Sequence, residues 1–547
     1  MKILLTTLNA KYIHKNLALR WLYVTRPDHF DVEIKEFTIN DDLVNVIEAM
    51  TLEKYDVVGI SVYIWNSEKT KILIDHIKTV NPNIRVILGG PEVSFDNDEW
   101  FDHAIEAIVV GEGERVFWEY LLGNTTESIK TIKEFSPKQA VVDLVWLEKF
   151  ESPYYLAFDL PTINERYLYL ETSRGCPYRC QYCLSSIDNH VRFFSLDYVD
   201  KVLLELNKYQ IRQVKFLDRT FNVNENRAIT LLSKLNELDN KSNYHLELVA
   251  DTISESMLSY ICHDIEKSRF RFEIGVQSFN TETLMAIKRQ SNIERLKRVI
   301  SMIANSGLYV HADLIAGLPY EDISSFKESY DQLFFLFTQE IQVGILKLLK
   351  GTPLKVKAKQ YQMLYDDKAP YLIKSTAWLN NDDLQKIMLV DLATEKLYNN
   401  HKLRHTVIEL VSYHNISPFE LMALLGEVVS QLKKPYQNKE LFLKLFDSLK
   451  TIYDEELIKG LLLFDYYRYT KQRPTRLFYT DKRYKDIEKI VLDQMIIDEQ
   501  TLYNYSMITP IIYQNNHMYQ LVLYNDQQGP SVCYLINSTN GKVSMLI

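Results

Sequence analysis

The first 125 residues alternate short apolar runs with amphipathic stretches. The apolar runs predict strands and the amphipathic stretches predict helices. Near-continuous apolar strands that alternate with helices are typical of a doubly wound parallel sheet, so residues 1–125 are predicted to form one such domain. The predicted strands are residues 2–8, 32–37, 57–63, 85–88 and 107–110, and the predicted helices are residues 17–24, 42–50, 68–80 and 114–122.

A second alternating series predicts another α/β domain over residues 165–355. Six strand–helix units in this length predict an open or partial (β/α)6 barrel, whose chemistry would lie on loops at the carboxyl ends of the strands. The predicted strands are residues 167–171, 213–217, 245–249, 271–276, 309–315 and 342–347, and the predicted helices include residues 196–208, 227–238, 254–265 and 293–303. Residues 126–164 lack clear periodicity and carry prolines, so they are predicted to be a connector.

The last third, residues 356–547, is predicted to be a mixed extension. Ser417, Pro418 and Glu420 form a helix-start pattern, and an apolar periodicity follows over residues 421–432. Beyond Pro474 the pattern changes to short aromatic and β-branched runs at residues 511–513 and 519–524. Turn candidates at Asn515-Asn516 and Asn540-Gly541 complete the prediction of helices followed by a small antiparallel sheet.

Composition limits the classes of protein that this chain can form. Its 547 residues, with 46% apolar and 25% charged, predict a folded chain of several domains. The N-terminus turns polar too soon for a signal peptide, and no stretch approaches the roughly 20 apolar residues that span a bilayer, so a cytoplasmic protein is expected. A net charge of −9 argues against a nucleic-acid-coating surface, although a local basic groove would not show in the total.

Cysteine usage carries the clearest chemical signal. Cys176, Cys180 and Cys183 follow a predicted strand in a C-x3-C-x2-C pattern, and one short loop with three thiolates can hold one metal centre. Soft thiolates select iron–sulfur clusters or zinc, and three ligands would leave one iron of a four-iron cluster open. The alternatives are a zinc site completed by His190 and thiols buried without metal. Cys262 and Cys533 lie far away and are predicted to be small buried hydrophobes.

Polar and glycine residues gather where the predicted strands end. In the first domain, Ser61 could donate a hydrogen bond, and Gly89-Gly90 would let a ligand approach the backbone, although simple turns are the alternative. No Gly-x-Gly-x-x-Gly follows the first strand, so a dinucleotide site is not expected. In the second domain, an inward Glu273 among apolar neighbours needs a partner.

The C-x3-C-x-aromatic-C motif after the first barrel strand resembles the radical S-adenosylmethionine superfamily. The resemblance implies that Cys176, Cys180 and Cys183 hold a [4Fe-4S] cluster, which cleaves S-adenosylmethionine reductively to a 5′-deoxyadenosyl radical. It also implies an electron donor such as flavodoxin or ferredoxin. The residues that it implies for S-adenosylmethionine are Tyr182 at the adenine, Glu273 at the ribose, Gln277 and Ser278 facing the same centre, and Asp218 and Arg219 near the methionine end. Asp218 could accept from the ammonium group there, although a helix-capping loop is the alternative for Asp218 and Arg219. Gly317 lies in the segment placed against the adenine, where it is expected to serve the shape of the backbone.

The first domain resembles the cobalamin-binding domain found ahead of radical enzymes. The resemblance lies in the loop with Tyr12 and His14, in Ser61, and in Leu88-Gly89-Gly90-Pro91-Glu92. The Asp-x-His-x-x-Gly signature is absent, which predicts cobalamin bound without a protein histidine on cobalt. The two resemblances together imply a methyltransferase that acts on an unactivated carbon.

The sequence leaves alternatives to that function open. One is a radical enzyme without cobalamin that performs a rearrangement or a methylthiolation. Another is a non-catalytic scaffold stabilised by metal, against which the lack of an obvious fourth ligand speaks. The sequence does not distinguish a small metabolite, a peptide or a tRNA base as substrate.

Overall fold

The computed structural model describes residues 1–51, 54–124, 126–131, 138–469, 475–478, 506–524, 532–537 and 543–546. The chain forms two compact units. The first comprises Met1–His311, Gly317–Asp322 and Ile345–Asn380, and the second comprises Ala312–Ala316, Ile323–Gly344 and Asn381–Ile547. None of the helices in these described ranges is long and apolar enough to cross a membrane.

The first unit opens with a six-stranded sheet in the order β2-β1-β3-β4-β5-β6. The five strands predicted from the sequence are confirmed, and they pair in parallel, with Ile3 opposite Val57 in the register of β1 and β3. The strands are β1 (Lys2–Asn9), β2 (Asp31–Thr38), β3 (Val57–Ser61), β4 (Arg85–Gly89), β5 (Ala107–Val109) and β6 (Ile129–Lys130). The short β6 is an addition, and it pairs antiparallel with β5.

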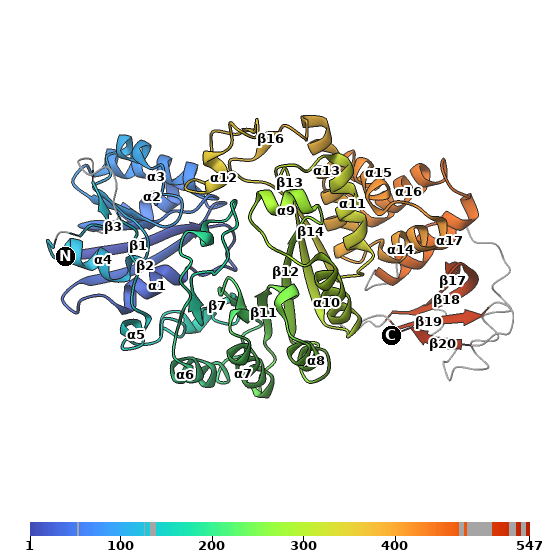
Figure 1. Cartoon of the computed structure of the whole chain (residues 1–547), viewed down its shortest axis with the longest axis horizontal. Coiled ribbons are helices and arrows are strands. Elements are labelled where there is room, and N and C mark those ends of the chain that lie inside the picture. The colour runs from blue at the N-terminus through green and yellow to red at the C-terminus, as the bar shows by residue number, and fades with distance from the viewer. Residues whose placement is uncertain are drawn as a thin grey trace. The chain divides into compact units, whose positions relative to one another are not determined.

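Helices cover both faces of this sheet. The helices are α1 (Leu17–Val24), α2 (Leu43–Thr51), α3 (Ser67–Val80) and α4 (Gly113–Leu121). Figure 1 shows α2 and α3 on one side of the sheet and α1 on the other. Alternate residues of β1 enter two separate cores, since Leu4 packs with residues of α2 and α3 whereas Ile3 packs with residues of α1 and α4. Two buried faces explain why the strands are almost continuously apolar.

The segment predicted as a connector contributes more structure than its sequence indicated. It supplies β6 to the first sheet, a short helix α5 (Leu144–Leu147) and a turn of 3-10 helix at Leu160–Thr162. Elements of two to four residues are too short to show a periodicity, so pattern analysis could not detect them. Pro137, one of the prolines in this segment, lies outside the described residues.

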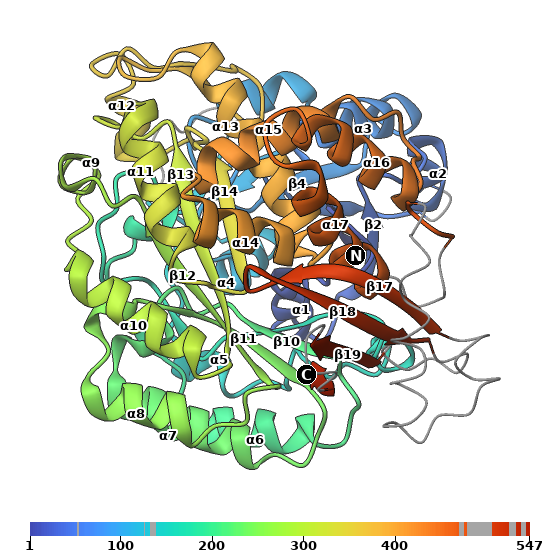
Figure 2. The same ribbon diagram turned by 90° about the vertical axis from the view of Figure 1, so that its right-hand side faces the viewer.

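The second sheet has the order β14-β13-β12-β11-β10-β7. Its strands are β7 (Leu168–Leu170), β10 (Gln213–Phe216), β11 (Asn243–Leu248), β12 (Phe270–Gln277), β13 (Tyr309–Ala316) and β14 (Glu340–Ile345), so all six predicted strands are confirmed. The neighbours from β7 to β12 pair in parallel. Figure 2 shows α6 (Leu196–Leu206), α7 (Glu225–Glu237) and α8 (Glu255–His263) in a row along one side of these strands.

Further short elements complete the first unit. They are β8 (Ser173–Arg174), β9 (Arg192–Phe193), α9 (Thr281–Ala286), α10 (Ile293–Asn305), α12 (Pro353–Val356), β15 (Leu364–Tyr365) and β16 (Ile373–Ser375). Side-chain caps fix several helix starts, because Ser195, Asn224, Ser254 and Asn292 each accept a hydrogen bond from a backbone N–H of the first turn.

The second unit combines helices with a four-stranded antiparallel sheet, as predicted for the C-terminal third. Its helices are α11 (Ile323–Phe334), α13 (Asn381–Ala393), a π-helical turn at Thr394–Asn399, α14 (Arg404–His414), α15 (Pro418–Ser430), α16 (Asn438–Leu449) and α17 (Glu455–Tyr469). Its sheet contains β17 (Ser506–Tyr513), β18 (Asn516–Leu523), β19 (Val532–Asn537) and β20 (Val543–Leu546) in sequence order.

Two local predictions in this unit can be compared with the structure. Ser417 caps α15 by accepting from the N–H of Glu420, which confirms the predicted helix start. The hairpin between β17 and β18 turns at Gln514-Asn515, one residue earlier than expected, with both residues at positive φ. The turn candidate Asn540-Gly541 lies outside the described residues.

Asp465 in α17 makes the stability of the second unit depend on pH. Its buried carboxylate accepts from the N–H and hydroxyl of Thr406 and from the N–H of His405, yet burial raises the pKa of Asp465 to about 7. Between pH 4 and pH 7 the folded protein therefore keeps a proton that the unfolded chain has released. The free energy of unfolding must fall as pH rises through this window, by roughly 4 kcal/mol in total.

We expect urea unfolding of wild type and Asp465→Asn between pH 5 and pH 8 to reveal this contribution. Asp465→Asn has no titrating group at this position and therefore serves as the reference. The stability of the wild type relative to Asp465→Asn should decrease with rising pH and level off above about pH 7, where Asp465 has lost its proton in the folded protein as well. Stability curves that stay parallel at every pH would contradict the assignment.

Candidate functional site

The cysteine loop is closed at its base by a short ladder. β8 pairs antiparallel with β9, with Arg174 opposite Arg192, and the loop between them carries the three cysteines. Gly175 begins the loop at φ +90°, where an added Cβ would meet the carbonyl oxygen of His190 at 2.2 Å. The N–H of Cys176 donates to the carbonyl of Asp188 at 3.0 Å. The start of the loop is therefore held tightly against its return segment.

The three thiols lie in a largely buried environment. All three are free, and the residues Cys176 and Cys180 are only 9% and 6% exposed, while Cys183 is half-buried. Cys176 Sγ lies 3.7 Å from the hydroxyl of Thr220, and Arg289 donates to Cys180 Sγ at 4.0 Å. Burial raises the pKa of the Cys180 thiol, and the Arg289 charge acts in the opposite direction. A bound metal would deprotonate such thiols outright.

The donor set of the loop suits a cluster better than a single zinc ion. Three thiolates leave one iron of a four-iron cluster open, whereas a structural zinc site needs four protein ligands. His190, the alternative fourth zinc ligand, is exposed.

Asp218 organises the strand end that leads into the cysteine loop. It is buried, and its two oxygens accept from the N–H and hydroxyl of Thr172 and from the hydroxyl of Ser173, at 2.6–2.9 Å. Burial raises the pKa of Asp218, and these hydrogen bonds oppose that effect. Its contact with an ammonium group stays a prediction. Arg219 is more exposed, and its guanidinium lies 3.9 Å from the carboxylate of Glu247.

Tyr182 and Arg289 lie beside the thiols. Tyr182 is half-buried, and burial raises the pKa of its phenol well above the ordinary value. Arg289, which the sequence analysis missed, contacts Cys180 and also donates to the carbonyl of Gly275 in β12. It follows α9 without any motif, so no sequence signal marked it.

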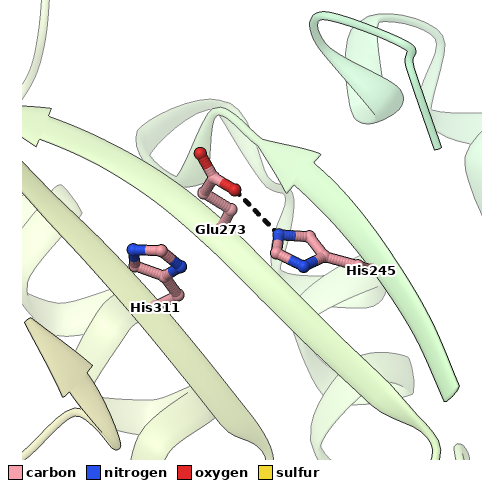
Figure 3. Close-up of side chains that lie close together, drawn as sticks. All are labelled: His245, Glu273 and His311. Atoms are coloured by element: carbon pink, nitrogen blue, oxygen red, sulfur yellow. Dashed lines mark hydrogen bonds and ion pairs between the residues drawn. The ribbon is translucent and has the colours of Figure 1, made fainter. Parts of the chain in front are cut away.

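The remaining residues predicted to bind S-adenosylmethionine lie on β12, just after β12, and just after β13. Glu273 Oε2 lies 2.8 Å from His245 Nε2 (Figure 3). The sequence predicted that Glu273 needs a partner but did not identify His245 as that partner. Gln277 has a φ of +69°, and Ser278 is buried and donates to Glu321. Gly317 has a φ of +95°, a conformation that favours glycine, which supports a structural role for it.

A cavity of about 860 Å³ lies at the carboxyl ends of the first sheet. Four of the five residues predicted to bind cobalamin line it, namely His14, Ser61, Gly89 and Gly90. Its wall also includes Tyr169 and Glu171 from the start of the second sheet, and Leu184, Ile187, Leu217 and Arg219 near the cysteine loop. Tyr12 does not line the cavity; its side chain is half exposed, and its hydroxyl donates to Glu165.

His14 and Gly90 show how this cavity is shaped. His14 Nδ1 lies 2.6 Å from the hydroxyl of Tyr169, and burial followed by the charges of Lys215 and Lys11 lowers the pKa of His14. Gly90 has a φ of +105°, and an added Cβ would meet the carbonyl oxygen of Val62 at 2.5 Å. A neutral imidazole and an uncovered stretch of backbone therefore face the same space.

Arg174 connects the cavity wall with the cysteine loop. It is nearly buried and pairs at 2.7 Å with Glu114 at the start of α4 and with Glu171, while Glu112 lies at 3.5 Å. Glu171 also accepts from the indole N–H of Trp21 at 2.6 Å. These charged groups are paired, as buried charges require. The first sheet and the cysteine loop therefore share one ion-pair network.

Three family models match the chain. The B12 binding domain matches residues 3–121, and the radical SAM superfamily matches residues 170–333. A model described as a protein of unknown function (DUF4080) matches residues 359–528.

Known proteins resemble part of the chain. The chain is 24% identical to 2-(S-pantetheinyl)-carbapenam-3-carboxylate methyltransferase of Streptantibioticus cattleyicolor, over 56% of this chain and 48% of the relative. It is also 24% identical to the cobalamin-dependent radical SAM methyltransferase TokK of Streptomyces tokunonensis, over 58% of this chain and 51% of the relative. The matched part therefore spans about half the length of these relatives.

A solved structure extends the likeness to most of the fold. The cobalamin-dependent S-adenosylmethionine radical enzyme OxsB, with aqua-cobalamin bound, covers 91% of this chain and 81% of its own chain. The TM-score is 0.61 at 16% identity. At that identity the likeness is one of fold.

Proposed function

Because this chain belongs to the cobalamin-binding branch of the radical S-adenosylmethionine superfamily, we propose that it is a methyltransferase that cleaves S-adenosylmethionine reductively. The cofactors of this branch are a [4Fe-4S] cluster, S-adenosylmethionine and cobalamin. When bound, the cluster supplies an electron and cobalamin carries a methyl group. The proposed reaction transfers that methyl group to an unactivated carbon, and a flavodoxin or ferredoxin is the proposed electron donor.

One observation carries this proposal. A single cavity is lined both by the strand ends of the first sheet and by residues that flank the cysteine loop. A cofactor in this cavity would be held by the first domain while it faces the loop that supplies the cluster ligands. Parallel sheets bind ligands beyond the carboxyl ends of their strands, which agrees with this position.

The residues of the chain have distinct roles in the proposal. Cys176, Cys180 and Cys183 hold the cluster, and the positive charge of Arg289 beside Cys180 offsets part of the negative charge of the thiolates. Asp218 fixes the strand end before the loop through Thr172 and Ser173. Tyr182, Arg219, Gln277 and Ser278 remain the proposed contacts of S-adenosylmethionine, and the ribose contact of Glu273 stays a prediction. Gly317 is proposed to shape the turn beside the cofactor rather than to contact it through chemistry of its own.

Anaerobic reconstitution tests the function. The protein would be supplied with iron, sulfide, a reductant and S-adenosylmethionine, with and without cobalamin, and the products would be analysed by mass spectrometry. We expect 5′-deoxyadenosine in both arms and a methylated product only with cobalamin. Turnover that is indifferent to cobalamin would instead favour a rearrangement or methylthiolation. A protein that never cleaves S-adenosylmethionine would favour a metal-stabilised scaffold.

The coordination of cobalt gives a separate prediction. His14 lines the cavity, but the chain lacks the Asp-x-His-x-x-Gly signature that supplies a histidine to cobalt. We therefore expect the Co(II) form of bound cobalamin to show no superhyperfine splitting from a protein nitrogen in its electron paramagnetic resonance spectrum. Nitrogen splitting that disappears in His14→Ala would overturn the prediction.

A further inference from the structure

We propose that His245, Glu273 and His311 bind one divalent transition-metal ion, such as Zn²⁺, at a site separate from the cysteine loop. The three residues lie on β11, β12 and β13, which are consecutive in the order of the second sheet. All three belong to the first unit. Figure 3 shows the two imidazole rings on either side of the Glu273 side chain.

The sheet register brings the three side chains together. Glu273 lies opposite Glu247 and His245 lies opposite Arg271, so His245 and Glu273 are diagonal neighbours. One ligand atom from each of the three residues lies within 4.8 Å of the other two. His245 Nε2 is 2.8 Å from Glu273 Oε2, and the imidazole rings are 6.3 Å apart at an interplanar angle of 65°. This spacing requires only small side-chain rotations to close around an ion.

The donor set matches known metal chemistry. Zinc binds imidazole nitrogen at about 2.0–2.1 Å and carboxylate oxygen at about 2.0–2.2 Å, which separates tetrahedral ligands by about 3.4 Å. Two imidazoles and one carboxylate also suit iron, cobalt and nickel. Three protein ligands leave at least one coordination position for water or a substrate atom.

The site is shielded from solvent, because the side chains of His245 and Glu273 are 15% and 30% exposed and His311 is buried. A metal ion there would be held by a deprotonated carboxylate and two neutral imidazoles, so its binding should weaken as the pH falls and the ligands take up protons.

A titration with Co²⁺ tests the site in the full-length chain. The parent protein would carry Cys176→Ala, Cys180→Ala and Cys183→Ala, so that no thiolate of the loop can bind the probe. We expect about one Co²⁺ per chain, with visible bands of nitrogen and oxygen ligation. His245→Gln, Glu273→Gln and His311→Gln should each weaken binding at least about tenfold, because even partners behind a ligand contribute roughly 10–100-fold in affinity. His190→Gln, an exposed histidine of the cysteine loop, is the matched control and should leave binding unchanged.

The titration would overturn the proposal if the parent took up no Co²⁺ at about 100 μM. It would also overturn the proposal if the His311→Gln variant bound Co²⁺ with the same affinity as the parent. Thermal unfolding provides a second measurement if a substitution disturbs folding: Zn²⁺ should raise the Tm of the parent, since a ligand of the native state stabilises it. An unchanged Tm would count against the site. The parent has no cluster ligands in the loop, so this test is independent of the proposed function.

Discussion

Replacing any one of Cys176, Cys180 and Cys183 with alanine is expected to abolish the cleavage of S-adenosylmethionine. Each thiol would supply one of three corners of the cluster, and an iron without its thiolate would be lost or left exposed. The measurements are the iron and sulfide content after anaerobic reconstitution, about four of each in the wild type, and the formation of 5′-deoxyadenosine.

Cys262→Ala is the matched control for these variants. Cys262 is a buried free cysteine in α8 whose pKa is raised by burial, and it is far from the loop in sequence. This variant should keep its iron and its activity. If a loop variant retained a full complement of iron and still produced 5′-deoxyadenosine, the assignment of the cluster ligands would be wrong, as it would if the wild type bound only zinc.

Gly90→Ala is expected to destabilise the first domain and to abolish cobalamin binding. The residue has a φ of +105°, and the new Cβ would meet the oxygen and nitrogen of Val62 at 2.5 and 3.0 Å. These atoms belong to the backbone at the end of β3, where the N–H of Val62 donates to Gly89, so they cannot move aside cheaply. Backbone strain and the clash together should cost about 3 kcal/mol or more.

Gly89→Ala is expected to weaken cobalamin binding without destabilising the fold. Gly89 lies in the same cavity wall, but an added Cβ there meets only Val109 Cβ, at 3.9 Å. Gly89→Ala should therefore unfold at the same urea concentration as the wild type while its affinity for cobalamin falls, because the methyl group occupies the space of the ligand. Equal affinity in Gly89→Ala and the wild type would mean that the corrin ring and its tail do not approach this edge.

Much of the fold was predictable because its long elements carry a clear period. Residues 17–24 were predicted as a helix and form α1 with the same bounds, and the cap at Ser417 was read from three residues. The pairs β8–β9 and β5–β6 were missed because a two-residue strand has no alternation to detect. Their existence depends on which distant segments meet, and that information is spread over the whole chain.

Part of the candidate site was likewise predictable from the sequence, and part was not. The cysteine loop was predictable, since its three ligands lie within eight residues of one another. The partners of Asp218 lie about 45 residues upstream in sequence, and His245, Glu273 and His311 lie on three different strands. Tertiary pairs of this kind leave no local spacing to recognise. Arg289 was missed for the same reason, because only the fold brings it to Cys180.

The ion pairs of Arg174 limit how far the first domain can be treated as an exchangeable module. Glu112 and Glu114 on one side and Glu171 on the other share this single guanidinium, and Arg192 also pairs with Glu112 at 2.6 Å. A chimaera that joined residues 1–121 of another protein to this barrel would have to bring matching acids, or Arg174 would lose two of its partners. Domain exchange should therefore be designed with the boundary residues transferred as a set.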